Sequence, residues 1–140
     1  MKEIQTKTCI KFRPKKSGDK SFIYITNKKR GCHSKLGFLN APQQLNLEFP
    51  GCRRHGTIIH EFMHSLGFYH EQSRPDRDNY ITVNLNNVEP PSKKYENPKA
   101  QFQKYTTNID VHRTPYDLCS VMHYWPGALG KVIQIYKILN

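Results

Sequence analysis

The sequence has no long apolar run and few acidic residues. None of its hydrophobic stretches approaches the roughly 20 residues that a membrane-spanning helix needs, and residues 1–12 lack the apolar core of a signal peptide. Its 11 aspartates and glutamates stand against 22 lysines and arginines, which gives a formal net charge of +11. The total of 140 residues is the size of one domain that is long enough to bury a core.

The excess of positive charge is concentrated in residues 11–35, which hold nine lysines and arginines and one acid, Asp19. Such a segment is a candidate contact for polyanions such as heparin-like glycans, nucleic acids or acidic proteins. A solvated loop surface has the same composition, so charge alone does not distinguish the two. Nucleic acid is the weakest of these partners, because the chain lacks a helix-turn-helix pattern, a glycine–aromatic RNA-binding signature and finger-type Cys/His spacing.

CxxC pairs are absent as well, which argues against a zinc ribbon or a thioredoxin-like redox site. The four cysteines are scattered along the chain as Cys9, Cys32, Cys52 and Cys119. Their even number is compatible with two disulfides in an oxidising compartment. It is equally compatible with four free thiols, and the count does not decide between these states.

Strands are predicted in the first third of the chain. Residues 8–14 and 21–26 are short runs rich in isoleucine, phenylalanine, tyrosine and threonine, separated by a turn-like segment. Residues 44–49 alternate polar and apolar side chains, which predicts a third strand with one buried face.

A helix is predicted over residues 57–66, because apolar side chains recur at positions 58, 59, 62, 63 and 66. Thr57 is its expected N-cap and Gly67 lies just past its end. From residue 72 onward prolines are frequent, with one short helix expected near 99–105 and a strand or short helix within 131–140. Strands, then a helix, then an irregular C-terminal half indicate an α+β fold.

The predicted helix carries a metal-ligand pattern. His60 and His64 lie one turn apart on one helix face, so both imidazoles can bind the same ion. Glu61 follows the first histidine, where its carboxylate can reach a water beside the metal rather than the metal itself. Gly67 can take the positive φ that turns the chain, and His70 follows in that turn. Three neutral imidazoles leave one tetrahedral position of zinc open, as a catalytic site requires.

A lone HExxH also occurs by chance, since histidine and glutamate are common on helix surfaces. The complete HExxHxxGxxH pattern fixes five residues over eleven positions, and a second element, SVMHY at residues 120–124, follows downstream. A methionine after the metal-binding helix belongs to the extended pattern of zinc proteases. The two elements together favour a zinc protease over a chance cluster.

These residues match the pattern of a known family. HEFMHSLGFYHEQSRPDRDNY, followed by SVMHY, closely resembles the astacin family of metzincin zinc metalloendopeptidases, whose signature HExxHxxGFxHExxRxDRD is met at every fixed position. TCIKF, the spacing of Cys32 and Cys52, GTIIHE and TPYDLCSVMHY extend the resemblance over most of residues 7–125. The resemblance implies a metzincin-like fold, with a small mixed sheet packed on the zinc-site helix.

The resemblance also implies roles for individual residues. His60, His64 and His70 would bind one Zn2+ ion, and Glu61 would be the general base. Tyr124 would be a mobile tyrosine that stabilises the oxyanion. The implied substrate is a polypeptide, and the implied location of the protein is outside the cell.

Four structural residues are implied in the same way. Met122 would form an apolar floor beneath the metal, and Cys32 and Cys52 would form a short disulfide. Glu71 would lie near the buried N-terminus of a mature enzyme. Residues 44–49 match the family's edge strand, which pairs with the substrate main chain.

The chain departs from the family pattern at both ends. From the resemblance we expect the family's first strand and most of its first helix to lie outside residues 1–140, and Glu71 to lack its expected partner. Beyond Tyr124 the resemblance fades, and no closing cysteine matches Cys9. We therefore expect residues 1–140 to form a single, partial catalytic domain, in which Cys9 and Cys119 are free thiols or an improvised bridge.

Two principal interpretations follow. The first is a zinc-dependent metalloendopeptidase that cuts internal peptide bonds through a zinc-activated water, as the intact metal-site residues favour. The second is a zinc-binding but inactive fragment that serves at most as a binding module, as the missing scaffold favours. A basic polyanion-binding protein is a third interpretation, and it rests on charge alone.

Overall fold

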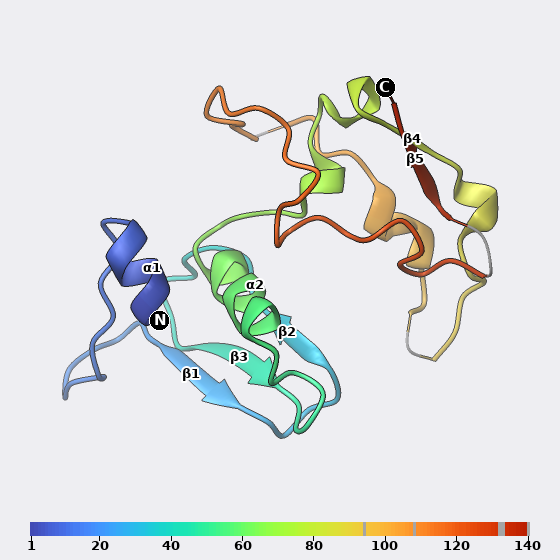
Figure 1. Cartoon of the computed structure of the whole chain (residues 1–140). Coiled ribbons are helices and arrows are strands. Elements are labelled where there is room, and N and C mark those ends of the chain that lie inside the picture. The colour runs from blue at the N-terminus through green and yellow to red at the C-terminus, as the bar shows by residue number, and fades with distance from the viewer. Residues whose placement is uncertain (94, 108, 132–133, 140) are drawn as a thin grey trace. The chain divides into compact units, whose positions relative to one another are not determined.

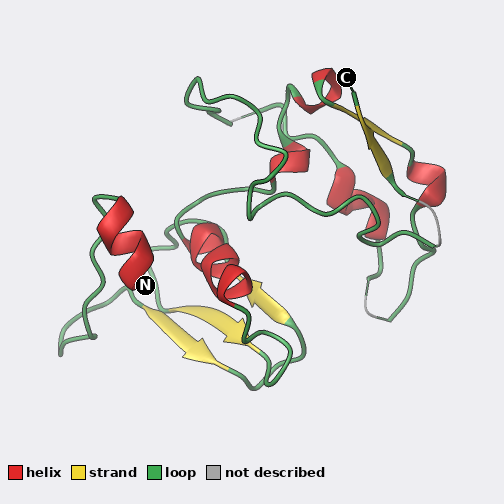
Figure 2. Cartoon of the chain, in the orientation of Figure 1, coloured by secondary structure: helices red, strands yellow, loops and turns green. Residues whose placement is uncertain are grey.

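The computed structural model describes residues 1–93, 95–107, 109–131 and 134–139 (Figure 1). The chain divides into two units, Met1–Phe68 and Tyr69–Asn140. Among the described residues, the two α-helices belong to the first unit, whereas the second consists mainly of loops, short 3-10 helices and one strand pair (Figure 2). No helix among the described residues is long and apolar enough to cross a membrane.

The first unit contains a three-stranded sheet made of β1 (Ile23–Thr26), β2 (Cys32–Ser34) and β3 (Gln43–Leu47). The strands lie in the order β1-β3-β2. β1 runs parallel to β3, whereas β2 is antiparallel to it. The sheet is therefore small and mixed, and the prediction of an α+β fold of this kind is confirmed.

The central position of β3 corrects one expectation, because residues 44–49 were matched to an edge strand. β3 is hydrogen-bonded on both sides, and β1 and β2 lie at the two edges instead. The alternation of residue types is misleading because Leu45 and Asn46 are both fully buried. The Asn46 side chain is satisfied inside the unit, since Nδ2 donates to the carbonyl oxygens of Lys29 at 2.8 Å and Gly31 at 2.6 Å. From sequence alone, a buried asparagine whose polar atoms are all hydrogen-bonded cannot be distinguished from an exposed one.

The strand predicted at residues 8–14 is not formed. The segment follows α1 (Lys2–Lys7) and bonds back to it: the Phe12 amide donates to Gln5 Oε1 at 2.6 Å, and Thr8 Oγ1 donates to the Ile4 carbonyl at 2.7 Å. A strand needs a neighbouring strand as its hydrogen-bond partner, and residue composition does not supply one.

The metal-site helix is α2 (His55–Ser65), and the helix prediction is confirmed with a different start. Arg54 occupies the N-cap position, so Thr57 lies inside the helix. Leu66 is the C-cap, and Gly67 takes a φ of +102°, as the predicted end requires. Phe62 anchors the helix in the core of the first unit, where it packs with Ile4 and Leu45.

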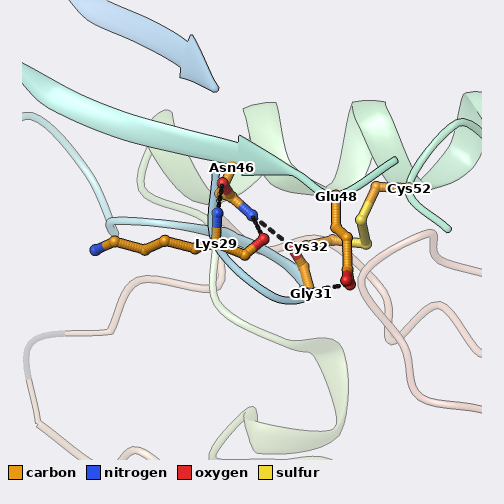
Figure 3. The surroundings of a disulfide bond; sticks show 6 residues. All are labelled: Lys29, Gly31, Cys32, Asn46, Glu48 and Cys52. Atoms are coloured by element: carbon orange, nitrogen blue, oxygen red, sulfur yellow. Dashed lines mark hydrogen bonds between the residues drawn. A yellow bond between two sulfur atoms is a disulfide. The ribbon is translucent and has the colours of Figure 1, made fainter. Parts of the chain in front are cut away.

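A disulfide joins Cys32 of β2 to Cys52 in the segment after β3, so the pairing implied by the family resemblance is present. Figure 3 shows this disulfide beside the side chains of Asn46 and Glu48, which point toward the loop that precedes β2. Glu48 Oε2 accepts a hydrogen bond from the Gly31 amide at 2.6 Å. The remaining cysteines, Cys9 and Cys119, are free and exposed, which is one of the two alternatives expected.

In the second unit, η1 (Glu71–Ser73) and η2 (Arg77–Asn79) precede β4 (Ile81–Val83), and η3 (Leu85–Asn87) and η4 (Pro98–Phe102) follow it. β5 (Tyr136–Ile138) pairs with β4 in antiparallel orientation. The core cluster consists of buried Val88, Phe102 and Ile135.

The irregular C-terminal half is thus confirmed, and the short helix expected near 99–105 is the 3-10 helix η4. The terminal segment 131–140 contributes a strand, which was one of the two expected forms. Its positions 132, 133 and 140 lie outside the described residues.

Candidate metal centre

Two of the predicted ligands lie one turn apart on α2. The rings of His60 and His64 are 4.6 Å apart between centroids and perpendicular to each other. His64 Nδ1 lies 2.9 Å from the carbonyl oxygen of Phe68. Because a carbonyl oxygen only accepts hydrogen bonds, Nδ1 carries the proton and Nε2 keeps the lone pair that a metal needs. Burial lowers the pKa of His64, which favours this neutral form.

The third predicted ligand joins the first two. One nitrogen from each of His60, His64 and His70 lies within 4.8 Å of the other two. Three imidazole nitrogens gathered in this way are a donor set that suits zinc, and they would hold the ion while leaving it accessible to water or substrate.

Glu61 supplies a second test of the metal site. The residue follows His60 directly and is only 4% exposed. Its Oε2 atom is buried and has no hydrogen-bond partner among the described residues. Burial raises the pKa of this carboxyl to about 7, and a nearby divalent cation would act in the opposite direction. An orphaned carboxylate oxygen next to a histidine ligand fits a site made for a cation.

Met122 and Tyr124 lie beside the segment that carries His70. The Glu71 amide donates to the Met122 carbonyl at 3.0 Å, and Met122 is 3% exposed. The Tyr124 ring lies 4.5 Å from the His70 ring between centroids. Tyr124, the expected mobile tyrosine, is thus a neighbour of the third histidine, and Met122, the expected floor residue, is bonded to the residue that follows it.

Glu71 has partners from this part of the chain. Its Oε1 atom accepts hydrogen bonds from Arg74 Nη1 at 3.1 Å and from the Asp117 amide at 2.9 Å. Arg74 also forms two hydrogen bonds of 2.9 Å with the Asp76 carboxylate. Arg77 is buried and donates to the carbonyl oxygens of Gln72 and Phe102. The charged residues of the RxDRD stretch therefore hold the turns after His70 in place.

Sequence reasoning missed two residues near Tyr124. Gln72 is fully buried, and its Oε1 atom accepts a hydrogen bond from the Tyr124 amide at 3.1 Å. His123 Nδ1 lies 2.6 Å from the Tyr124 carbonyl, and its Nε2 lies 2.7 Å from the Tyr116 hydroxyl. Neither residue type signals such a role, because burial and bonding arise only from the fold.

These features define the zinc-binding core of the metalloproteinase class. They are a helix with HExxH, a small mixed sheet packed against that helix, and a third histidine after a glycine turn. The comparisons with known proteins agree. The family model described as Astacin, a peptidase family, matches residues 1–139. The chain belongs to the astacin family.

The relatives of the chain are longer proteins. It is 46% identical to zinc metalloproteinase nas-13 of Caenorhabditis elegans over 132 residues, which are 94% of this chain and 28% of that protein. It is 40% identical to high choriolytic enzyme 1 of Oryzias latipes over 130 residues, 93% of this chain and 43% of that enzyme.

A solved structure of the same fish enzyme, described as a hatching enzyme zinc-protease, superposes with a TM-score of 0.88 at 34% identity. The match covers 99% of this chain and 66% of that one. The chain thus spans less than half the length of the curated relatives named here.

Proposed function

We propose that residues 1–140 are a partial catalytic domain of a zinc-dependent metalloendopeptidase that hydrolyses internal peptide bonds of polypeptides. The observation that carries the proposal is the gathering of the His60, His64 and His70 nitrogens. The family match across both units supports treating them as one domain. The relatives described as zinc metalloproteinases support the reaction class.

His60, His64 and His70 would hold the metal. When bound, zinc polarises a carbonyl oxygen and lowers the pKa of water to about 7. Glu61 is the general base: its unsatisfied Oε2 accepts a proton from the attacking water and later gives it to the amine nitrogen of the leaving peptide. Burial of the carboxyl keeps bulk water from competing for this proton.

Tyr124 donates its hydroxyl hydrogen to the oxygen on which negative charge develops. A single donor of this kind commonly lowers the barrier by about 2.7–4 kcal/mol. The closeness of its ring to His70 supports the assignment. Met122, buried beside Glu71, provides the apolar floor.

We further propose that the protein is secreted. The Cys32–Cys52 disulfide supports this location, because such bonds persist in oxidising compartments. The exposed lysines and arginines of residues 11–35 support a weak contact with polyanions at most, and Arg13 is already paired with Asp19 at 2.7 Å. Nucleic acid is not an expected partner.

The proposal is tested by loading the full chain with zinc, measuring the metal content, and following cleavage of an unstructured protein with and without a chelator. We expect one bound zinc ion per chain and cleavage that stops on chelation and returns with added zinc. His70→Ala should lose the metal, whereas His112→Ala, an exposed histidine outside the cluster, should keep it. One bound zinc ion without chelator-sensitive cleavage would instead show a binding module without catalysis.

A further inference from the structure

We infer that Gln72 is a positioning residue that holds Tyr124 beside the third histidine. This inference rests on the proposed role of Tyr124 in the reaction. Gln72 does not belong to the metal-ligand set, and its side chain acts on Tyr124 through the backbone.

Gln72 is built into the second unit as a fixed acceptor. It is fully buried, its Nε2 donates to the Gln101 carbonyl at 3.4 Å, and its Oε1 accepts from the Tyr124 amide at 3.1 Å. Its own carbonyl oxygen accepts a hydrogen bond from Arg77 Nη1 at 2.9 Å. A buried amide with partners at both ends has its orientation set by its surroundings.

The hydrogen bond from the Tyr124 amide to Gln72 is one of two hydrogen bonds that join the segment after His70 to residues 122–124. The other runs from the Glu71 amide to the Met122 carbonyl at 3.0 Å. Consecutive residues after His70 thus bind alternate residues of the 122–124 segment. The Tyr124 carbonyl is held as well, by the Tyr136 hydroxyl and His123 Nδ1.

These ties determine where the tyrosine ring points. The direction of a Cα–Cβ bond follows from the positions of the backbone amide and carbonyl, and both are fixed at Tyr124. The ring is then confined to rotation about its side-chain bonds, starting 4.5 Å from the His70 ring. Without the Gln72 acceptor, the Tyr124 amide loses this hydrogen bond, and the segment shifts to find another acceptor.

The first test needs no catalysis and uses amide hydrogen exchange and NMR on the full isotope-labelled chain. Gln72→Met keeps the side-chain length but removes the acceptor. It should speed hydrogen exchange of the Tyr124 amide about tenfold and weaken the nuclear Overhauser effect between the Tyr124 and His70 rings. Gln72→Glu retains an acceptor oxygen, and its buried carboxyl, kept protonated by burial, can still donate to the Gln101 carbonyl, so this variant should preserve both. Ile81→Val, a conservative change in the same unit, should leave both unchanged. Wild-type exchange and ring contact in Gln72→Met would overturn the inference.

The second test is kinetic. Gln72→Met should lower kcat about tenfold with KM unchanged in the wild-type background, but should have no further effect on kcat in the Tyr124→Phe background. An equal loss in both backgrounds would mean that Gln72 is merely structural. If the wild-type chain shows no chelator-sensitive cleavage, the proposed function fails, while the exchange experiment still decides the role of Gln72.

Discussion

His64 Nδ1 donates a hydrogen bond to the carbonyl oxygen of Phe68 at 2.9 Å, across the end of the helix that carries the metal site. The geometry depends on Gly67, whose φ of +102° turns the chain so that the Phe68 carbonyl faces back toward the ring. The turn is closed by hydrogen bonds from the Gly37 and Gly67 amides to the His64 carbonyl, at 2.8 and 2.9 Å. One glycine therefore both ends the helix and sets the tautomer of a metal ligand.

Replacing Gly67 with alanine should weaken metal binding. A side chain at this φ costs about 1–3 kcal/mol, and relief of the strain moves the Phe68 carbonyl away from His64. We expect zinc affinity to fall about 10–100-fold, as for other losses of a partner behind a metal ligand. Competition with a chromophoric chelator measures this change.

Gly51→Ala is the matched control for that substitution. Gly51 has no left-handed φ, and an added Cβ would meet no atom within 4 Å. Its zinc affinity should equal that of the wild type. Equal affinities for both variants and the wild type would contradict the role given to Gly67.

The Cys32–Cys52 disulfide should stabilise the first unit, because it closes a loop with a sequence separation of 20 residues. A loop of this size corresponds to about 3 kcal/mol in the chain-entropy model. Cys32→Ser should lower the free energy of unfolding by about that amount, as measured by circular dichroism in increasing denaturant. Cys9→Ser removes a free, exposed thiol and should change nothing. Equal stability of the two variants would refute the prediction.

Asn46 should be among the most sensitive positions of the sheet. Its side chain accepts from the Lys29 amide at 3.1 Å and donates to the Lys29 and Gly31 carbonyls, so it holds the loop before β2 (Figure 3). Asn46→Ala leaves these groups without partners and should cost about 2–4 kcal/mol of unfolding free energy. The exposed Asn27 provides a comparison, since Asn27→Ala should stay within about 0.5 kcal/mol of the wild type. A small effect at both positions in the same denaturation experiment would count against this view of Asn46.

The metal site was largely predictable because its pattern is local. Helical periodicity places His60 and His64 on one face, and a glycine such as Gly67 most easily takes the left-handed φ at the end of a helix. These features depend on residues within one short stretch, and the structure confirms the helix and its end. The three histidines come together for the same reason, because all of them lie within this stretch.

The arrangement of the strands was less predictable because it depends on pairing between distant segments. Residues 44–49 alternate as a half-buried strand would, yet β3 is central because β1 and β2 pair with its two edges. Residues 8–14 have strand-like composition but bond to α1 instead. Gln72 shows the same limit within the site, since only the fold buries it against Tyr124.

The most direct test of the account is the pair Glu61→Gln and Glu89→Gln, two identical chemical changes at a buried and an exposed glutamate. Zinc content and cleavage rate are measured on both variants. Glu61→Gln should keep one zinc ion and lose cleavage by about 10²–10⁴-fold, because the base is removed and no ligand is. Glu89→Gln should match the wild type in both measurements. Loss of zinc in Glu61→Gln, or cleavage at the wild-type rate, would contradict the assignment of Glu61 as the general base of a zinc peptidase.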